Sequence, residues 1–194
     1  MRIGKQERRT RETEICVTID LDGSGKAKIA TGVGFLDHML NSFAVHGRFD
    51  LEVVVEKSDL EIDCHHTVED TGIVLGKAIG EALGDKAGIA RFGSFYIPMD
   101  EALSFAAVDI SGRPFLVYDN VHKNEMIGNY ETDMTEEFFR AVAFNAGMTL
   151  HLKSLYGTND HHRIEAMFKA FAYAMAMAVK KLDTDAPVST KGVL

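Results

Sequence analysis

Two copies of one short pattern of potential metal ligands occur in the chain. Residues 65–69 read His-His-Thr-Val-Glu and residues 161–165 read His-His-Arg-Ile-Glu. On a helix, residues three or four apart share a face, so each histidine of a pair can lie on the side of the glutamate. Imidazole and carboxylate groups together bind divalent metals. One copy could equally be a solvated helix start, but two copies in a repeated context predict a metal site.

The two histidines of each pair are adjacent in sequence, so on a helix they point about 100° apart. We therefore expect the neighbours to bind different metal ions. One helix cannot close both sites by itself, which predicts that the sites lie between the two halves of the chain or between subunits.

The elements that must position these residues follow from hydrophobic periodicity. Alternating apolar residues predict a strand over residues 8–21, and the turn at residues 22–25 predicts a hairpin with residues 26–31 as its partner. Helical spacing predicts helices over residues 35–47, 66–83, 134–146 and about twenty residues from Asp160. Further strands are predicted over 50–57, 91–97, 103–110, 114–118 and 148–154, and a polar loop over 120–133.

The order strand–strand–helix–strand–helix occurs twice, which indicates an internal duplication. Aligning residues 37–40 with 136–139 places Phe43 opposite Val142 and Leu51 opposite Leu150, and a histidine pair then follows in each copy. We therefore predict an α+β fold with pseudo-twofold symmetry, in a single domain over residues 1–194 made of two similar halves, about 1–90 and 91–194.

The same alignment places His38 and Glu137 in matching positions, each one helix before a histidine pair. The candidate metal ligands are therefore His38, His65, His66, Glu69, Glu137, His161, His162 and Glu165. Eight ligands would suit two six-coordinate ions with open positions. Mixed nitrogen and oxygen donors favour Mn(II) over Zn(II), and Fe(II) or Co(II) also fit.

Charge and composition exclude several classes of protein. The net charge is −8, from 21 basic and 29 acidic residues, so an anion site must be local and a nucleic-acid surface is not expected. Arg91, Arg113 and Lys191 lie beside a glycine or in a turn, and Ser189-Thr190-Lys191-Gly192 could clasp a phosphate, although each cation alone could be merely solvated. The charged N-terminus, two cysteines and no membrane-length apolar run predict a cytoplasmic protein without a membrane partner.

Nine segments in order carry a family resemblance over essentially the whole chain: residues 9–13 (RTRET), 35–40 (FLDHML), 65–70 (HHTVED), 91–93 (RFG), 98–101 (PMDE), 111–114 (SGRP), 146–151 (AGMTLH), 160–165 (DHHRIE) and 189–192 (STKG). With these segments the chain resembles the imidazoleglycerol-phosphate dehydratase family of histidine biosynthesis. The resemblance implies helices packed between two sheets and two Mn(II) ions per active site at subunit contacts. It also implies a homo-oligomer of twenty-four subunits built from trimers.

The resemblance also implies the reaction, which is dehydration of D-erythro-imidazole glycerol phosphate to imidazole acetol phosphate. It implies substrate-binding roles for Glu12, His46, Arg91, Arg113, Ser189, Thr190 and Lys191. At position 137, where many members have a histidine ligand, this chain has Glu137, and a carboxylate can replace imidazole on Mn(II).

The C–H bond to be broken has no neighbouring carbonyl group, so the substrate's imidazole ring must stabilise the carbanion. Coordination to a divalent metal lowers the pKa of the ring N–H and favours a metal-bound imidazolate intermediate. Glu165, Glu69 and Glu12 are the candidate proton-transfer residues. Two alternatives remain: a two-metal phosphate-ester hydrolase, and a protein whose metal only joins subunits.

Overall fold

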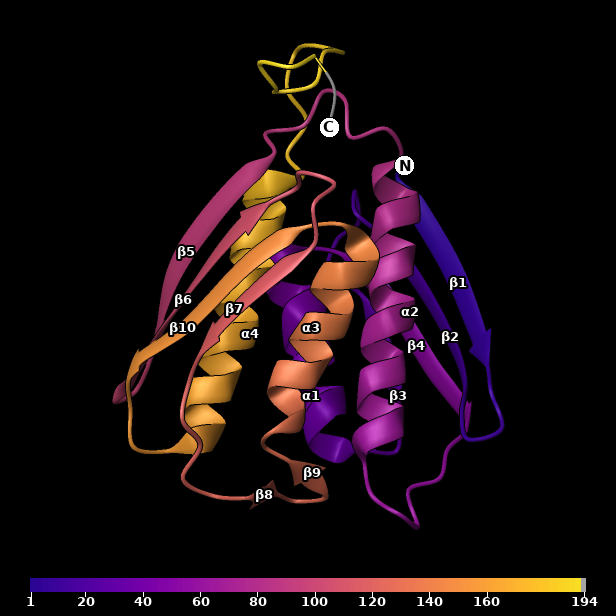
Figure 1. Cartoon of the computed structure of the whole chain (residues 1–194), viewed down its shortest axis with the longest axis vertical. Helices are drawn as coiled ribbons and strands as arrows, with labels where there is room; N and C mark the ends of the chain where they lie inside the picture. The colour runs from indigo at the N-terminus through magenta and orange to yellow at the C-terminus, as the bar shows by residue number, and fades with distance from the viewer. Residues whose placement is uncertain (193–194) are drawn as a thin grey trace.

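Two four-stranded sheets form the outer layers of the molecule, and helices lie between them (Figure 1). This computed structural model describes residues 1–192. The first sheet has the order β1-β2-β4-β3 and the second the order β5-β6-β10-β7. The strands of the first sheet are β1 (Ile3–Arg9), β2 (Glu14–Asp20), β4 (Asp50–Lys57) and β3 (Ala27–Ala30). Those of the second are β5 (Phe92–Met99), β6 (Ala102–Asp109), β10 (Thr149–Tyr156) and β7 (Phe115–Asp119).

The helices in the part of the chain that the structure describes are α1 (Gly34–Gly47), α2 (His65–Leu83), α3 (Met134–Ala146) and α4 (Asp160–Ala178). Helix α2 packs on the first sheet and against α3, whereas α4 packs on the second sheet and against α1. Phe43 of α1 stacks on Phe171 of α4 with ring centroids 5.2 Å apart, and Phe139 of α3 lies 5.5 Å from the same ring. The core therefore joins the two halves in one hydrophobic cluster.

The duplication is visible at two glycines where a strand crosses a helix. A Cβ atom added to Gly4 of β1 would lie 1.9 Å from the carbonyl oxygen of Ala78 in α2. A Cβ atom added to Gly93 of β5 would lie 1.9 Å from the carbonyl oxygen of Ala174 in α4. The same crossing occurs in both halves, and the predicted α+β fold, with helices between two sheets, is confirmed.

The predicted strand over residues 8–21 is confirmed over β2, Glu14–Asp20, but it is not a single strand, because a tight turn divides this region. Strands β1 and β2 pair antiparallel across it, from Ile3 opposite Asp20 to Arg9 opposite Glu14. The hydroxyl of Thr10 accepts hydrogen bonds from the backbone N–H groups of Glu12 and Thr13 and so holds the turn. The outward face of β1 is charged, which conceals its strand character in the sequence.

The predicted hairpin partner of that strand is wrong. Strand β3 pairs parallel with β4, and β4 lies between β2 and β3. One carboxylate oxygen of Asp50, at the start of β4, accepts from the backbone N–H groups of Ser24, Gly25 and Lys26 at 2.8, 3.1 and 2.9 Å. These hydrogen bonds hold the turn against the start of β4, so the turn residues do not form a two-stranded hairpin.

Residues 120–133, predicted as a loop, contain two short paired strands, β8 (Met126–Ile127) and β9 (Tyr130–Glu131). The Tyr130 side chain is fully buried, and its hydroxyl lies 2.9 Å from the hydroxyl oxygen of Thr135. The segment is therefore anchored to the start of α3. Within residues 1–192, every helix is too short or too polar to span a lipid bilayer.

Candidate metal centre

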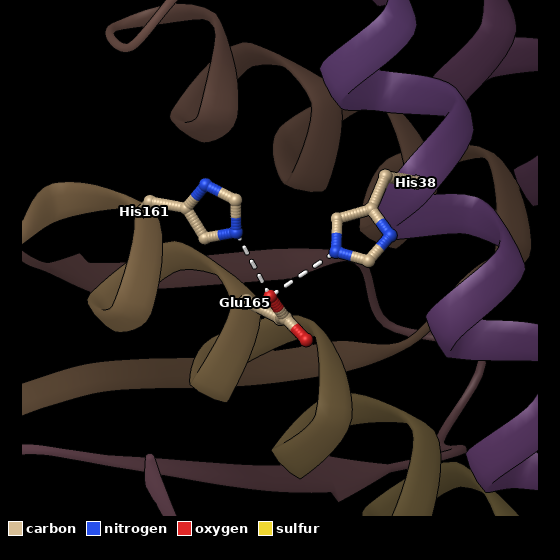
Figure 2. A group of neighbouring side chains, drawn as sticks. All are labelled: His38, His161 and Glu165. Carbon is tan, nitrogen blue, oxygen red and sulfur yellow. Dashed lines mark hydrogen bonds and ion pairs between the residues drawn. The ribbon is translucent and has the colours of Figure 1, made fainter. Parts of the chain in front are cut away.

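The side chains of His38, His161 and Glu165 converge between the two halves of the chain (Figure 2). Oε2 of Glu165 lies 3.2 Å from Nε2 of His38 and 3.0 Å from Nε2 of His161. His38 comes from α1 and the other two residues from the first turns of α4. One donor atom from each residue lies within 4.8 Å of the others, so the group could hold a metal ion. Three of the predicted ligands therefore lie together between the two halves of the chain.

The electrostatic environment of Glu165 favours the ionised carboxylate. Burial alone would raise its pKa, but the ammonium group of Lys169, 2.7 Å from Oε1, and the ring of His38 outweigh burial and lower the pKa below its ordinary value. One carboxylate oxygen therefore faces a cation and the other faces two imidazole nitrogens. An ionised oxygen with two nearby ring nitrogens is a suitable donor set for a divalent metal.

The first-half counterpart of this group is more open. Nε2 of His65 lies 3.5 Å from Oε2 of Glu69, and both side chains are about two-fifths exposed (42% and 41%). Glu137, the sequence counterpart of His38, does not join them within one chain. Its carboxylate lies 3.4 Å from Nε of Arg140, although Glu137 and His65 line the same cavity. The structure thus brings His38, His161 and Glu165 together, whereas His65, Glu69 and Glu137 do not form such a group within residues 1–192.

The second histidine of each pair points to different partners from the first, as predicted. The rings of His65 and His66 are 5.9 Å apart and inclined at 69°, and those of His161 and His162 are 6.1 Å apart at 81°. Nδ1 of His66 lies 2.6 Å from Oδ2 of Asp59 and 3.8 Å from the carboxylate of Glu12.

Two carboxylates lie near the ring of each of these second histidines. Nδ1 of His162 lies 2.7 Å from Oε2 of Glu101, and its Nε2 lies 3.7 Å from Asp100. The hydrogen bond to Asp59 raises the pKa of His66, and the hydrogen bond to Glu101 raises the pKa of His162. Asp59 and Glu101 could not be predicted as site residues from the sequence, because neither belongs to the repeated His-His-x-x-Glu pattern.

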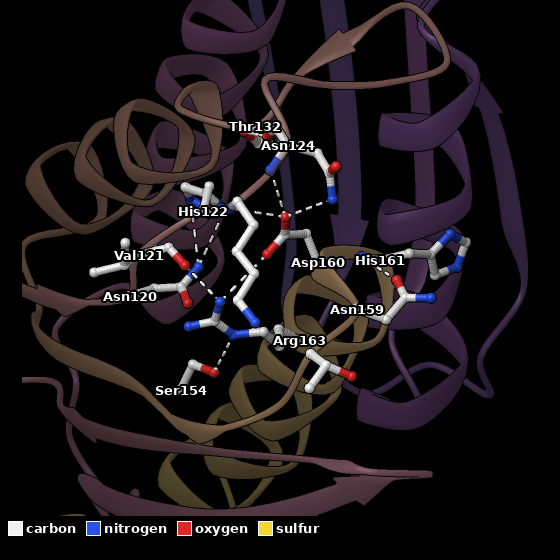
Figure 3. Close-up of polar contacts among 12 residues, drawn as sticks. Asn120, Val121, His122, Asn124, Thr132, Ser154, Asn159, Asp160, His161 and Arg163 are labelled. Atoms are coloured by element: carbon white, nitrogen blue, oxygen red, sulfur yellow. Dashed lines mark hydrogen bonds and ion pairs between the residues drawn. The ribbon is translucent and has the colours of Figure 1, made fainter.

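Local hydrogen bonds fix the start of α4, which carries the second pair. The side chain of Asn159 accepts a hydrogen bond from the backbone N–H of His161 at 2.9 Å and caps the helix. The carboxylate of Asp160 accepts from the backbone N–H groups of Lys123 and Asn124, and the guanidinium of Arg163 donates to the carbonyl of Val121 (Figure 3). Residues 121–124 are therefore tied to the helix that presents His161 and His162.

The predicted phosphate-binding residues gather elsewhere. The carboxylate of Asp109 accepts hydrogen bonds from Nε and Nη2 of Arg91 at 2.7 and 3.2 Å. The same carboxylate lies 3.8 Å from Nη2 of Arg113. Arg91 also donates to the carbonyl of Val188 at 2.7 Å, next to the segment that contains Ser189, Thr190 and Lys191. Within that segment the hydroxyl of Ser189 accepts from the backbone N–H of Lys191. The structure thus brings Arg91 to this C-terminal segment, and Asp109 lies between Arg91 and Arg113.

In a single chain this cationic group lies far from the second histidine pair. The backbone N–H of Arg91 donates to the carbonyl of Ala178, the last residue of α4, whereas His161 lies in the first turn. At about 1.5 Å of rise per residue the two ends of the helix are roughly 26 Å apart. In Figure 1, α4 runs from the lower part of the view, where the loop after β10 leads into it, to the upper part beside the start of β5.

His46 lies in the last turn of α1, apart from both groups. Its Nδ1 is 3.4 Å from the hydroxyl of Tyr173, and burial together with the nearby ammonium of Lys169 lowers its pKa. The structure therefore places the predicted substrate residue His46 neither with the histidine pairs nor with Arg91 and Arg113.

Known proteins resemble this chain over most of its length. The family model described as imidazoleglycerol-phosphate dehydratase matches residues 31–175. The imidazoleglycerol-phosphate dehydratase of Acetivibrio thermocellus is 62% identical over 188 residues, covering 96% of each chain. The corresponding protein of Caldanaerobacter subterraneus is 56% identical over the full length of both chains.

Solved structures agree with this relationship. The crystal structure of imidazoleglycerol-phosphate dehydratase from Staphylococcus aureus matches with a TM-score of 0.83 and 41% identity, covering 92% of this chain and 99% of that one. The crystal structure of the Pyrococcus furiosus protein in complex with (S)-C348 matches with a TM-score of 0.84 and 36% identity, covering 97% and 100%. The chain therefore belongs to the imidazoleglycerol-phosphate dehydratase family, whose members are hydro-lyases.

Proposed function

We propose that this chain dehydrates D-erythro-imidazole glycerol phosphate to imidazole acetol phosphate in histidine biosynthesis, with two Mn(II) ions in each active site. The observation that carries the metal dependence is the convergence of His38, His161 and Glu165 on one point. Two imidazole nitrogens and one carboxylate oxygen suit Mn(II), and three donors leave positions for further ligands and for substrate.

The metal, when bound, supplies Lewis acidity that lowers the pKa of the substrate's imidazole N–H and favours the imidazolate form. The chain's own residues would hold the metals and move the protons. Besides the converging group, the proposed ligands are His65, His66, Glu69, Glu137 and His162. No three of these five residues bring their donor atoms together within residues 1–192, so we infer that a neighbouring subunit completes the site.

The position of the cationic group supports a site shared between subunits. A substrate with one imidazole ring and a glycerol phosphate is shorter than about three extended residues, or about 10 Å. It cannot reach from His161 to Arg91 of the same chain across roughly 26 Å. Arg91, Arg113, Ser189, Thr190 and Lys191 would therefore hold the phosphate of a substrate bound to a neighbouring chain's metals. An assembly of trimers into twenty-four subunits, as the family resemblance implies, would meet this requirement.

The three candidate proton-transfer carboxylates differ in their environment. Glu165 is buried and contacts Lys169, His38 and His161, which suits a metal ligand. Glu12 and Glu69 are about half exposed, with side-chain exposures of 53% and 41%. Proton transfer to a substrate needs an accessible carboxylate, so this difference favours Glu12 or Glu69 for that role.

The test is ketone formation by chelator-stripped protein before and after addition of Mn(II). We expect product only with metal, and a loss of at least about 100-fold in kcat/KM for His161→Asn. His151→Asn, which changes an exposed histidine of β10, is the matched control and should keep full activity. Ketone formation without metal would remove the ions from the mechanism, and release of inorganic phosphate would indicate a hydrolase.

A further inference from the structure

The second histidine of each pair makes the same contact in both halves. Nδ1 of His66 lies 2.6 Å from Asp59, and Nδ1 of His162 lies 2.7 Å from Glu101. Neither carboxylate belongs to the helix that carries its histidine. Asp59 lies in the segment between β4 and α2, and Glu101 lies in the turn between β5 and β6.

The two carboxylates occupy different positions of the repeat. Glu101 follows Gly93 by eight residues, just as Glu12 follows Gly4 by eight, so Glu12 and not Asp59 is the sequence counterpart of Glu101. In the first half Asp59 takes the Nδ1 contact, and the carboxylate of Glu12 remains 3.8 Å away. Both halves therefore have a carboxylate on Nδ1 of the second histidine, although the two carboxylates come from different positions of the repeat. This indicates that the contact itself matters.

Both carboxylates are held in place by the surrounding chain. Oε1 of Glu101 accepts hydrogen bonds from the backbone N–H groups of Thr158 and Asn159 at 2.9 and 2.8 Å, which leaves Oε2 for the ring of His162. The Asp59 residue is only 7% exposed, and its Oδ1 has no hydrogen-bond partner within residues 1–192. Burial thus restricts the directions in which the Asp59 carboxylate can point.

An ionised carboxylate can only accept a hydrogen bond, so Nδ1 of the neighbouring neutral ring must carry the proton. The lone pair of that ring is then on Nε2, which is the atom available to a metal. Carboxylate–histidine–metal arrangements of this kind fix the tautomer and the direction of a ligand ring.

We propose that Asp59 and Glu101 are positioning residues that hold His66 and His162 in the Nδ1–H tautomer, so that each ring presents Nε2 to a metal ion. The metal part of this proposal rests on the proposed function, whereas the tautomer part does not. In the first half, Asp59 and not Glu12 makes this contact, so the carboxylate of Glu12 remains available to bind substrate.

The tautomers are tested first, by nitrogen NMR of metal-free protein labelled with ¹⁵N in histidine, at alkaline pH where the rings are neutral. We expect the Nδ1–H form for His66 and His162. Asp59→Ala and Glu101→Ala should each shift only the partnered ring toward the Nε2–H form. Glu61→Gln, an exposed change in the same segment as Asp59, is the control and should leave both rings unchanged. Rings in the Nε2–H form in the wild type, or unchanged rings in the alanine variants, would overturn the proposal.

The second measurement is the affinity for Mn(II), followed by electron paramagnetic resonance. Loss of a carboxylate that orients a ligand histidine typically weakens metal binding about 10–100-fold. Asp59→Ala and Glu101→Ala should each weaken binding by this factor, and Glu61→Gln should not. Unchanged affinity in both alanine variants, or weaker binding in Asp59→Ala with no change in the His66 tautomer, would refute the positioning role. Protein that shows the expected tautomers but binds no Mn(II) would instead refute the proposed function.

Discussion

Asp160 and Arg163 form a buried ion pair beside the second histidine pair. Their side chains are 1% and 9% exposed, and the closest charged atoms are 3.3 Å apart. Asp160 also accepts three hydrogen bonds, from the backbone N–H groups of Lys123 and Asn124 and from the Asn124 amide, while Arg163 donates to the hydroxyl of Ser154. Burial alone would raise the pKa of Asp160, but these hydrogen bonds lower it below its ordinary value.

Replacing Asp160 by asparagine would leave the guanidinium of Arg163 buried without a counter-charge. We expect the free energy of unfolding to fall by about 3 kcal/mol, because removing one partner of a buried pair is far more costly than removing an exposed one. Urea denaturation of metal-free protein measures the change.

The matched control is Asp119→Asn, which removes a pair with Lys153 whose side chains are more than half exposed. This change should cost less than about 1 kcal/mol. Equal losses in the two variants would show that the Asp160 pair does not stabilise the start of α4.

At the scale of elements, the close crossing of β1 over α2 and of β5 over α4 sets how each helix lies on its sheet. Both crossings use a glycine whose missing side chain lets the strand approach the helix backbone. The same helices carry the histidine pairs at their first turns. The glycines therefore help to set the position of the candidate ligands relative to the sheets.

Gly93→Ala should be strongly destabilising, by about 2–3 kcal/mol or more, because the new methyl group would overlap the carbonyl of Ala174 and force the strand away from α4. Gly4→Ala should behave in the same way at Ala78. Gly34→Ala is the matched control, since no atom lies within 4 Å of the added Cβ atom at the start of α1.

Thermal and urea unfolding of the three variants make the comparison. Alanine has the higher helix propensity, so Gly34→Ala should be neutral or slightly stabilising. Gly4→Ala or Gly93→Ala with wild-type stability would mean that the strands and helices adjust at little cost.

At the scale of the whole molecule, one carboxylate joins segments that are far apart in sequence. Asp22 binds the guanidinium of Arg2 at 2.8 Å and lies 3.6 Å from the ammonium of Lys181. Arg2 also donates to the carbonyl of Val179, just beyond α4. The beginning of the first half is therefore held to the end of the second, and Arg2 lowers the pKa of Asp22 to about 2.

This contact predicts an acid-sensitive contribution to stability. The folded-state pKa of Asp22 is below its ordinary value of 3.8, so the contribution is fully present above about pH 4 and is lost as the pH falls toward 2. Because the side chain is about a quarter exposed (26%), solvent screening reduces the contribution to about 1 kcal/mol.

The measurement is the free energy of unfolding of wild type and Asp22→Asn between about pH 5 and pH 2. The difference between the two proteins should shrink as the pH falls through this range. A constant difference would show that the charge of Asp22 contributes no pH-dependent stability.

Much of the local structure could be predicted from the sequence. The helix predicted over residues 134–146 coincides with α3 (Met134–Ala146), because apolar spacing marks its buried face and Gly147 ends it in a left-handed conformation. The approach of His161 to Glu165 was also predictable, since residues four apart on a helix are neighbours whatever surrounds them. The division of the chain into two similar halves was predictable from the repeated motifs.

Contacts between distant segments could not be predicted from the sequence and are seen only in the tertiary structure. Alternation along β3 does not reveal that its neighbour is β4, and the charged outer face of β1 conceals a strand that only its pairing with β2 defines. In the candidate site, the approach of His38 to Glu165 depends on the packing of α1 against α4. Asp59 and Glu101 likewise reach their histidines across loops.

The sequence by itself therefore determined the helices, the repeat and the ligand types, because periodicity and spacing act over a few residues. The tertiary structure alone decided which donors meet, because strand order and helix packing depend on burial across the whole chain. It also placed the second histidine pair and the Arg91 group at opposite ends of α4, which no spacing along the sequence encodes.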